Sequence, residues 1–148
     1  MDANALDRLD AERSALVDEF LRLEASLGLS VIKPHGVEIE LNRANTPEQV
    51  RGDMSGIYTL ETALIPDEVS RREAIRTLMT GNAQSDKHKD DADHLFETSK
   101  YGGGYFVTHD RRIHKRKAEL ASLAPGVQVV TLEEMVEVCR QYAKQRHQ

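Results

Sequence analysis

The clearest structural signal in the sequence is the segment Tyr105-Phe106-Val107-Thr108-His109-Asp110. Its uncharged, aromatic and β-branched start predicts a short strand over residues 105–108, of the kind found in the middle of a parallel sheet. Asp110 comes directly after this strand. Because ligands of open parallel sheets bind beyond the carboxyl ends of the strands, we expect Asp110 to lie at a functional edge.

Helical patterns alternate with short apolar runs on both sides of this segment. Leu16, Phe20, Leu23 and Leu27 recur at three- and four-residue steps and predict a helix over residues 10–27, ended by Gly28. Further strands are expected at 29–32 and 127–130, and further helices at 37–41, from 46 onward, and at 66–79, 92–101 and 132–143. This alternation predicts an α/β fold with a parallel sheet, and a length of 148 residues favours one domain.

Some boundaries can be read in two ways or depend on one residue. The spacing of Ile57, Leu60 and Leu64 suits a helix, whereas the threonines between them suit a strand. Pro34 is expected to stop the strand at 29–32. Thr46 is expected to cap the next helix, with Pro47 at its first position.

Composition excludes several classes of protein. Lys and Arg number 20 against 25 Asp and Glu, and the net charge of −5 argues against a purely electrostatic nucleic-acid binder. A single cysteine, Cys139, excludes an intramolecular disulfide and a cysteine-based zinc site. The charged N-terminal segment argues against a signal peptide, and no apolar run reaches the ~18 residues of a membrane helix. We therefore expect a cytoplasmic protein without a membrane span.

Three acidic residues stand where the end of a strand or helix would expose them, and Asp2 is a candidate fourth that follows no predicted strand. Asp110 follows a strand, Asp91 begins a helix, Glu40 lies on a short helix after a strand, and Asp2 lies near the N-terminus. Each has a simpler interpretation. Asp91 is a natural helix cap, Asp110 a turn residue, Glu40 a surface residue, and Asp2 part of a disordered terminus.

Four stretches together resemble the motifs of PIN domains, a family of metal-dependent nucleases that includes the VapC-type toxins of toxin–antitoxin pairs. They are Asp2-Ala3-Asn4-Ala5-Leu6, Val37-Glu38-Ile39-Glu40-Leu41, Asp91-Ala92-Asp93-His94-Leu95 and the segment from Tyr105 to Asp110 quoted above. Residues 129–134 are similar to the last strand and helix of the family. The order of these motifs agrees with the family over most of the chain.

The resemblance implies a three-layer α/β/α fold with a central, mostly parallel sheet that occupies residues 1–148 as a single PIN-like domain. In the family the first strand precedes the opening motif, so the resemblance implies a truncated first strand here. The segment from about residue 43 to residue 89 is longer than the corresponding segment in the smallest PIN domains, and we interpret it as a helical insertion or cap.

The resemblance also implies an activity, which is metal-dependent endoribonuclease cleavage of RNA. Asp2, Glu40, Asp91 and Asp110 are the expected catalytic residues, and Asp2, Asp91 and Asp110 are the expected ligands of Mg²⁺ or Mn²⁺, with Asp93 as an extra ligand. Clustered carboxylates repel one another, and a divalent cation neutralises that repulsion and activates water. The expected partners are an RNA substrate, an antitoxin protein and a second copy of the chain in a homodimer.

A run of positive charge, Arg111-Arg112-Ile113-His114-Lys115-Arg116-Lys117, follows Asp110. We expect Arg111, Arg112 and Lys115 to contact the phosphate backbone of a substrate, together with the hydroxyl of Thr108, which could orient a water or a ligand carboxylate. The simpler interpretation of the run is a solvated helix face.

Two histidines, a cysteine and a glycine cluster receive structural interpretations. His94 is expected to pack or bond within its helix rather than bind a metal, and Cys139 is expected in the core. His109 does not form the helix-borne His-Asp pair of metal phosphohydrolases, and Gly102-Gly103-Gly104 lacks the context of a phosphate loop. The alternative function is a non-catalytic PIN-like module for binding or assembly.

Overall fold

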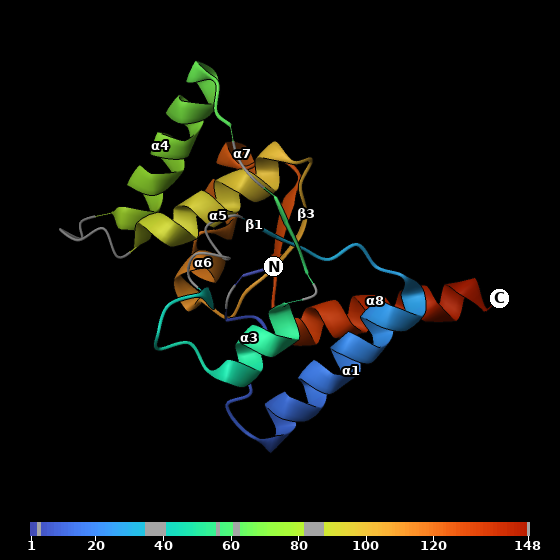
Figure 1. Ribbon diagram of the computed structural model, residues 1–148. Coiled ribbons are helices and arrows are strands. Elements are labelled where there is room, and N and C mark those ends of the chain that lie inside the picture. Colours follow the sequence, from blue (N-terminus) through green and yellow to red (C-terminus); the bar gives the residue numbers. More distant parts are fainter. Residues whose placement is uncertain (3, 35–40, 56, 61–62, 82–87, 148) are drawn as a thin grey trace.

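The computed structural model describes the chain except residues 3, 35–40, 56, 61–62, 82–87 and 148 (Figure 1). Its helices are α1 (Ala11–Leu27), α3 (Glu48–Met54), α4 (Pro66–Thr80), α5 (Lys89–Lys100), α6 (Arg111–Lys115), α7 (Lys117–Leu123) and α8 (Leu132–Arg146). Its strands are β1 (Ile32–Pro34), β2 (Tyr58–Leu60), β3 (Gly104–Val107) and β4 (Val127–Val130). The expected α/β class is therefore confirmed.

The described strands form two parallel pairs. β1 pairs with β2, with Ile32 opposite Tyr58, and β3 pairs with β4, with Val107 opposite Val130. Parallel pairing was expected, whereas one continuous sheet is not seen among the described residues. A PIN fold is not established by this topology.

The first two residues connect the two pairs. The α-amino group of Met1 donates a hydrogen bond to the carbonyl oxygen of Ile32 at 2.9 Å, and the amide of Asp2 donates to the carbonyl oxygen of Val107 at 3.0 Å. Burial lowers the pKa of the Met1 amine from 8.0 to about 6. Met1 and Asp2 thus lie between β1 and β3, as a strand residue would.

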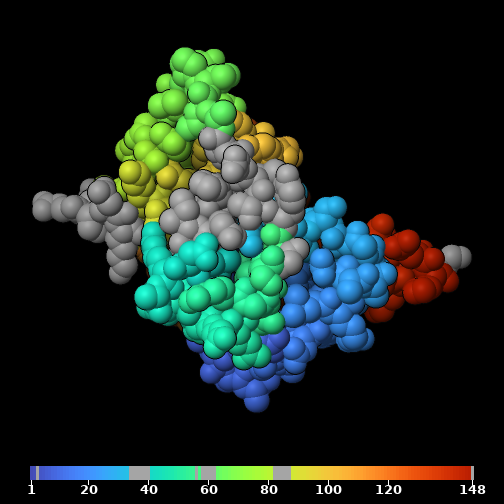
Figure 2. Space-filling view, in the orientation of Figure 1, coloured from blue at the N-terminus to red at the C-terminus, as the bar shows by residue number. Residues whose placement is uncertain are grey.

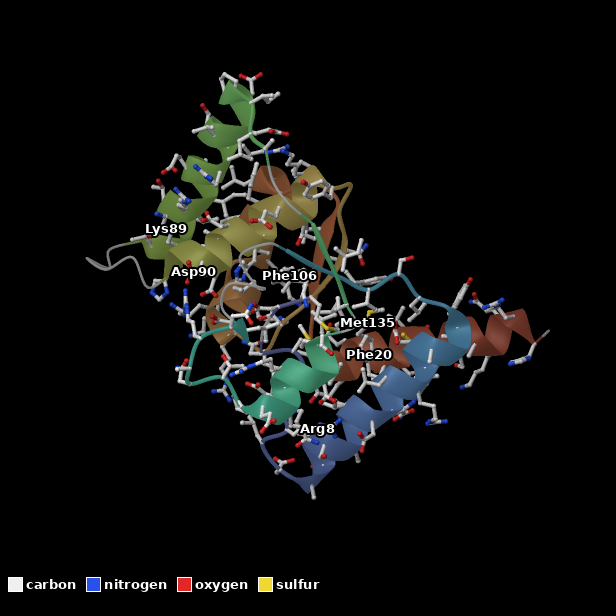
Figure 3. All side chains as sticks on the ribbon, in the orientation of Figure 1. Arg8, Phe20, Lys89, Asp90, Phe106 and Met135 are labelled. Carbon is white, nitrogen blue, oxygen red and sulfur yellow. The ribbon has the colours of Figure 1, made fainter. Side chains whose placement is uncertain are left out.

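Helices cover both faces of the β3–β4 pair. Val107 and Val130 pack into a core with Phe20 of α1 and Val136 of α8. The preceding residues of the two strands, Phe106 and Val129, point the other way into a second core, formed with buried residues of α4, α5, α6 and α7. This alternation follows from the two-residue repeat of a strand. Figure 3 shows Phe20 and Met135 near α1, α3 and α8, and Phe106 nearer α5.

Local capping explains the helix boundaries that were predicted well. The Asp10 side chain accepts a hydrogen bond from the Arg13 amide at 2.7 Å, and Gly28 ends α1 with φ of 63°. Thr131 caps α8 by accepting from the Glu134 amide at 3.1 Å. In Figure 2 the C-terminal end of α8 extends beyond α1 at one end of the molecule.

Several boundaries differ from the sequence-based predictions. α5 begins at Lys89 with His88 at its N-cap, so Asp91 lies in the first turn and does not cap the helix. β1 begins three residues later than the predicted strand, and Pro34 is its last residue rather than lying beyond its end. α3 has Pro47 rather than Thr46 at its N-cap, and Pro47 makes no side-chain capping bond.

The ambiguous segment near residue 58 is a strand, because β2 finds a partner in β1. The region from about 43 to 89, predicted as a helical insertion or cap, holds α3 and α4 and also this strand. Within the described residues, no helix combines the length and apolar character that a membrane crossing requires.

Candidate metal centre

Asp2 is the most buried of the predicted acidic site residues that the structure describes, with 3% of its surface exposed. Its position follows from the fold, because its amide bonds to the last residue of β3. The carboxylate accepts a hydrogen bond from the Thr108 hydroxyl at 2.6 Å and lies 3.2 Å from Nδ1 of His94. Asp2 is therefore an ordered residue that receives contacts from two other segments, and the disordered-terminus interpretation is wrong.

Thr108 ties the N-terminal residues to the loop after β3. Its side chain is fully buried, and its hydroxyl oxygen also accepts from the Asp110 amide at 3.1 Å. The side-chain oxygen of Asn4 accepts from the His109 amide at 3.1 Å. Thr108 thus orients the Asp2 carboxylate and fixes the backbone at Asp110.

Asp91 approaches the same point from the first turn of α5. Its pKa is raised from 3.8 to about 7, first by burial, then by the charges of Asp2 and Asp110. Three acids that are far apart in the sequence therefore lie close enough to raise the proton affinity of one of them.

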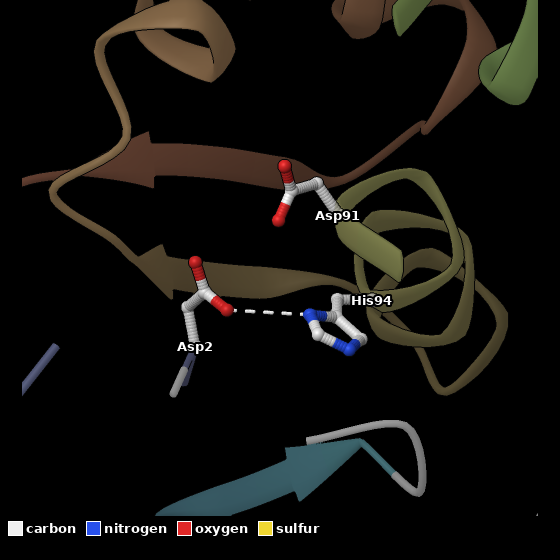
Figure 4. A group of neighbouring side chains, drawn as sticks. All are labelled: Asp2, Asp91 and His94. Carbon is white, nitrogen blue, oxygen red and sulfur yellow. Dashed lines mark hydrogen bonds and ion pairs between the residues drawn. The ribbon is translucent and has the colours of Figure 1, made fainter. Parts of the chain in front are cut away.

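His94 completes a group of possible metal ligands with Asp2 and Asp91 (Figure 4). One ligand atom from each of these residues lies within 4.8 Å of the other two. His94 is completely buried and sits one helical turn after Asp91, so both side chains share a face of α5. Among the described residues, this is the group that meets the geometry for a shared cation.

Arg112 lies beside the acids and contacts two of them. Its Nη2 atom is 3.0 Å from Oδ2 of Asp91 and 2.8 Å from Oδ2 of Asp110, and its Nη1 is 2.6 Å from Nε2 of His88. The Asp110 carboxylate also accepts from the Arg112 amide at 2.9 Å and caps α6. Because 41% of the Arg112 side chain is exposed, the guanidinium is both a neighbour of the acids and reachable from solvent.

The structure does not bring every predicted residue to this cluster. Asp93 faces α4, where its two oxygens accept from Arg76 at 2.6 and 2.7 Å, so its use as an extra ligand has no geometric support. Arg111 and Lys115 are exposed on α6. Glu40 lies outside the described residues.

One residue of the cluster had been assigned a different role from sequence. His94 was expected to pack or bond within its own helix, yet its ring reaches Asp2 at the start of the chain. The signal that could have found it is its spacing from Asp91, because positions three apart on a helix present neighbouring side chains.

Comparison with known proteins adds no assignment. A scan against protein-family models, a search of curated proteins and a search of solved structures each found no match for this chain. The chemistry open to the site follows from its own contacts, burial and charge.

Proposed function

We propose that this protein is a divalent-metal-dependent endoribonuclease that hydrolyses phosphodiester bonds of RNA. The observation that carries the proposal is the convergence of Asp2, Asp91 and Asp110, where burial and mutual repulsion raise the pKa of Asp91 to about 7. Acidic groups whose pKa is strongly shifted by burial and by neighbouring charges are typical of functional sites. The motif resemblance to PIN domains supports RNA as the substrate, an antitoxin as a partner and a homodimer as the assembly.

The donor set of the cluster fits a divalent cation. Asp2 and Asp91 offer carboxylate oxygens, which Mg²⁺ and Mn²⁺ both accept, and His94 offers an imidazole nitrogen, which suits Mn²⁺ better than Mg²⁺. Asp110 is not part of this group of three, but it shares the Arg112 guanidinium with Asp91 and is the next available carboxylate. When bound, such an ion lowers the pKa of water and neutralises charge on a phosphate.

The surrounding residues have separable roles in this proposal. Thr108 holds Asp2 in one orientation through the 2.6 Å hydrogen bond. Arg112 presents a guanidinium that can bind two phosphate oxygens at once, and its partial exposure allows it to turn towards a substrate. Arg111 and Lys115, exposed on the same short helix, supply further contacts to the phosphate backbone that depend on salt.

The test is cleavage of a labelled single-stranded RNA by the full chain with Mn²⁺ or Mg²⁺. We expect Asp91→Asn and Asp110→Asn to abolish cleavage. Asp90→Asn is the matched control, because Asp90 is the preceding residue of α5. Its exposed carboxylate does not contact the cluster's acids but forms an ion pair with Arg43, with an N–O distance of 3.0 Å. Cleavage at the unaltered rate in both Asp91→Asn and Asp110→Asn would rule out the mechanism.

A non-catalytic PIN-like binding or assembly module is the second candidate, and one observation favours it. Arg112 already contacts both Asp91 and Asp110, so this guanidinium offsets part of the negative charge that would attract a cation. Titration calorimetry with millimolar Mn²⁺ and Mg²⁺ separates the two functions. Absence of binding heat, together with absence of RNA cleavage, would favour the module.

A further inference from the structure

His88 lies outside the group of possible metal ligands but contacts the arginine beside it. The residue immediately precedes α5, and this end of α5 lies next to α6 (Figure 1). The Nε2 atom of His88 is 2.6 Å from Nη1 of Arg112, which is 24 positions away in the sequence. The contact therefore joins the helix that carries Asp91 to the helix that Asp110 caps.

The chemistry of this contact fixes the protonation of His88. A guanidinium group carries only hydrogen-bond donors, so Nε2 of His88 must accept and the ring hydrogen must be on Nδ1. Nδ1 is buried and has no hydrogen-bond partner among the residues that the structure describes, and the side chain forms no capping hydrogen bond at the start of α5. Within that part of the chain, the contact with Arg112 is thus the polar interaction that orients the ring.

The other contacts of Arg112 leave one of its donors available. A guanidinium has one hydrogen on Nε and two on each Nη atom. Nε donates to Oδ1 of Asp110 at 3.3 Å, Nη2 is shared by Asp91 and Asp110, and Nη1 donates to His88. The second hydrogen of Nη1 has no acceptor among the described residues. Because the guanidinium is planar, the hydrogen bond to His88 also fixes the direction of this second hydrogen.

A neutral ring suits this position better than a third carboxylate would. Carboxylates often bind guanidinium groups through two parallel hydrogen bonds, so Asp91 and Asp110 alone would draw both Nη atoms towards the acids. His88 competes for Nη1 without adding negative charge, so it neither cancels the positive charge of Arg112 nor repels a phosphate. The 41% exposure of the Arg112 side chain leaves the guanidinium open to such a ligand.

We propose that His88 is a positioning residue for substrate binding, and that its neutral ring holds Nη1 of Arg112 so that the second hydrogen of this nitrogen is presented to a phosphate group of RNA. This role rests on the proposed function, because the ligand is the RNA that the acid cluster would cleave. His88 acts through Arg112 and does not itself contact the substrate. A merely structural link between α5 and α6 would support stability but leave the number of phosphate contacts unaltered.

The test measures binding of a fluorescein-labelled single-stranded RNA to the full chain in a chelator, by fluorescence anisotropy at several salt concentrations. We expect His88→Leu to weaken binding about threefold to tenfold, as the loss of one hydrogen bond does. The slope of log K against log salt should become shallower by about 0.7, because one phosphate contact of a single strand is lost. His88→Gln, which retains an acceptor, should bind more tightly than His88→Leu. His147→Leu is the matched control and should bind RNA unchanged, since His147 is exposed at the end of α8.

A double-mutant cycle shows whether His88 acts through Arg112. In the Arg112→Ala background, His88→Leu should cause no further loss of RNA affinity and no further change of the salt slope. The same loss in both backgrounds would overturn the proposal. Unaltered affinity and slope in His88→Leu would also overturn it, even if that variant unfolds at a lower urea concentration. His88→Ala replaces His88→Leu in the cycle if leucine prevents folding.

The cleavage assay separates failure of this role from failure of the proposed function. Loss of cleavage in Asp91→Asn and Asp110→Asn, with an unaltered salt slope in His88→Leu, would overturn only the role of His88. Unaltered cleavage in both aspartate variants, with the expected result of the cycle, would overturn only the metal-dependent mechanism. Absence of RNA binding by the unaltered chain in the chelator would overturn the role of His88, whatever the cleavage assay shows.

Discussion

The Nδ1 atom of His94 lies 3.2 Å from Oδ1 of Asp2, although 92 positions separate the two residues in the sequence. Both side chains are buried, and Asp2 is also held by Thr108, which is 106 positions away. The start of the chain, α5 and the end of β3 are thus joined at one carboxylate. A change at any of these residues should therefore affect both the stability of the fold and the chemistry of the cluster.

Replacement of His94 tests this link. His94→Leu keeps a similar apolar volume but removes the hydrogen bond to Asp2, so the free energy of unfolding should fall by about 1–3 kcal/mol. If His94 binds or orients a cation, Mn²⁺ affinity should fall by about 10- to 100-fold. Urea denaturation and titration calorimetry measure the two effects, and His94→Gln, which retains a donor, should show smaller losses. A His94→Leu variant with unaltered stability and Mn²⁺ affinity would contradict this role.

Removal of the Arg112 guanidinium should have opposite effects on metal binding and on catalysis. In Arg112→Ala, Asp91 and Asp110 lose a neighbouring positive charge, so Mn²⁺ should bind more tightly, while RNA cleavage should slow because a phosphate contact is lost. Stability should change by only about 0–1 kcal/mol, since the side chain is partly exposed. Arg111→Ala, at the exposed neighbouring position, should leave Mn²⁺ affinity unaltered. Weaker Mn²⁺ binding in Arg112→Ala would show that the prediction is wrong.

The raised pKa of Asp91 predicts a pH dependence of folding in the absence of metal. The folded-state pKa of about 7 is above the value of 3.8 for a free carboxyl group, so the folded chain binds more protons between these two values. The contribution of Asp91 to the free energy of unfolding should therefore fall as pH rises through this window. Urea denaturation across the window, in a chelator, measures the decrease, which should be smaller in Asp91→Asn. Identical pH profiles for the two proteins would contradict the shifted pKa.

The same group predicts how pH affects metal binding. Carboxyl ligands must lose their protons before they bind a cation, so Mn²⁺ affinity should rise as pH increases towards and beyond about 7. Calorimetry in buffers of different ionisation heat would measure both the affinity and the protons released. Affinity that does not depend on pH would place the ion at carboxylates other than Asp91.

Two adjacent glycines before β3 provide a stability test that is independent of the acids. A methyl group at Gly103 would collide with the backbone carbonyl group of Gly126, whereas one at Gly102 would meet no atom within 4 Å. Both residues have positive φ, 78° and 99°, so both alanine variants carry a strain of ~1–3 kcal/mol. We expect Gly103→Ala to unfold at a clearly lower urea concentration than Gly102→Ala. Equal midpoints would show that the turn before β3 can move away from β4.

Much of the secondary structure could be predicted because its causes are local. The 3.6-residue repeat, the Asp10 cap and the glycine at position 28 together determine α1, and β3 and β4 stand out as short apolar runs. The less accurate predictions concern elements that depend on distant partners. β2 is a strand because β1 lies beside it, and the start of α5 lies before Asp91, where no capping side chain marks it.

The sequence by itself determined which residue types were available for chemistry: acids after a strand and in a helical turn, with basic residues following. Only the tertiary structure decided which of them meet. It places Asp2, Asp91 and His94 together and directs Asp93 to Arg76, although Asp91 and Asp93 are two residues apart. The physical reason is that helix periodicity and capping act over a few residues, whereas the meeting of side chains from distant segments depends on how helices and strands pack around the shared cores.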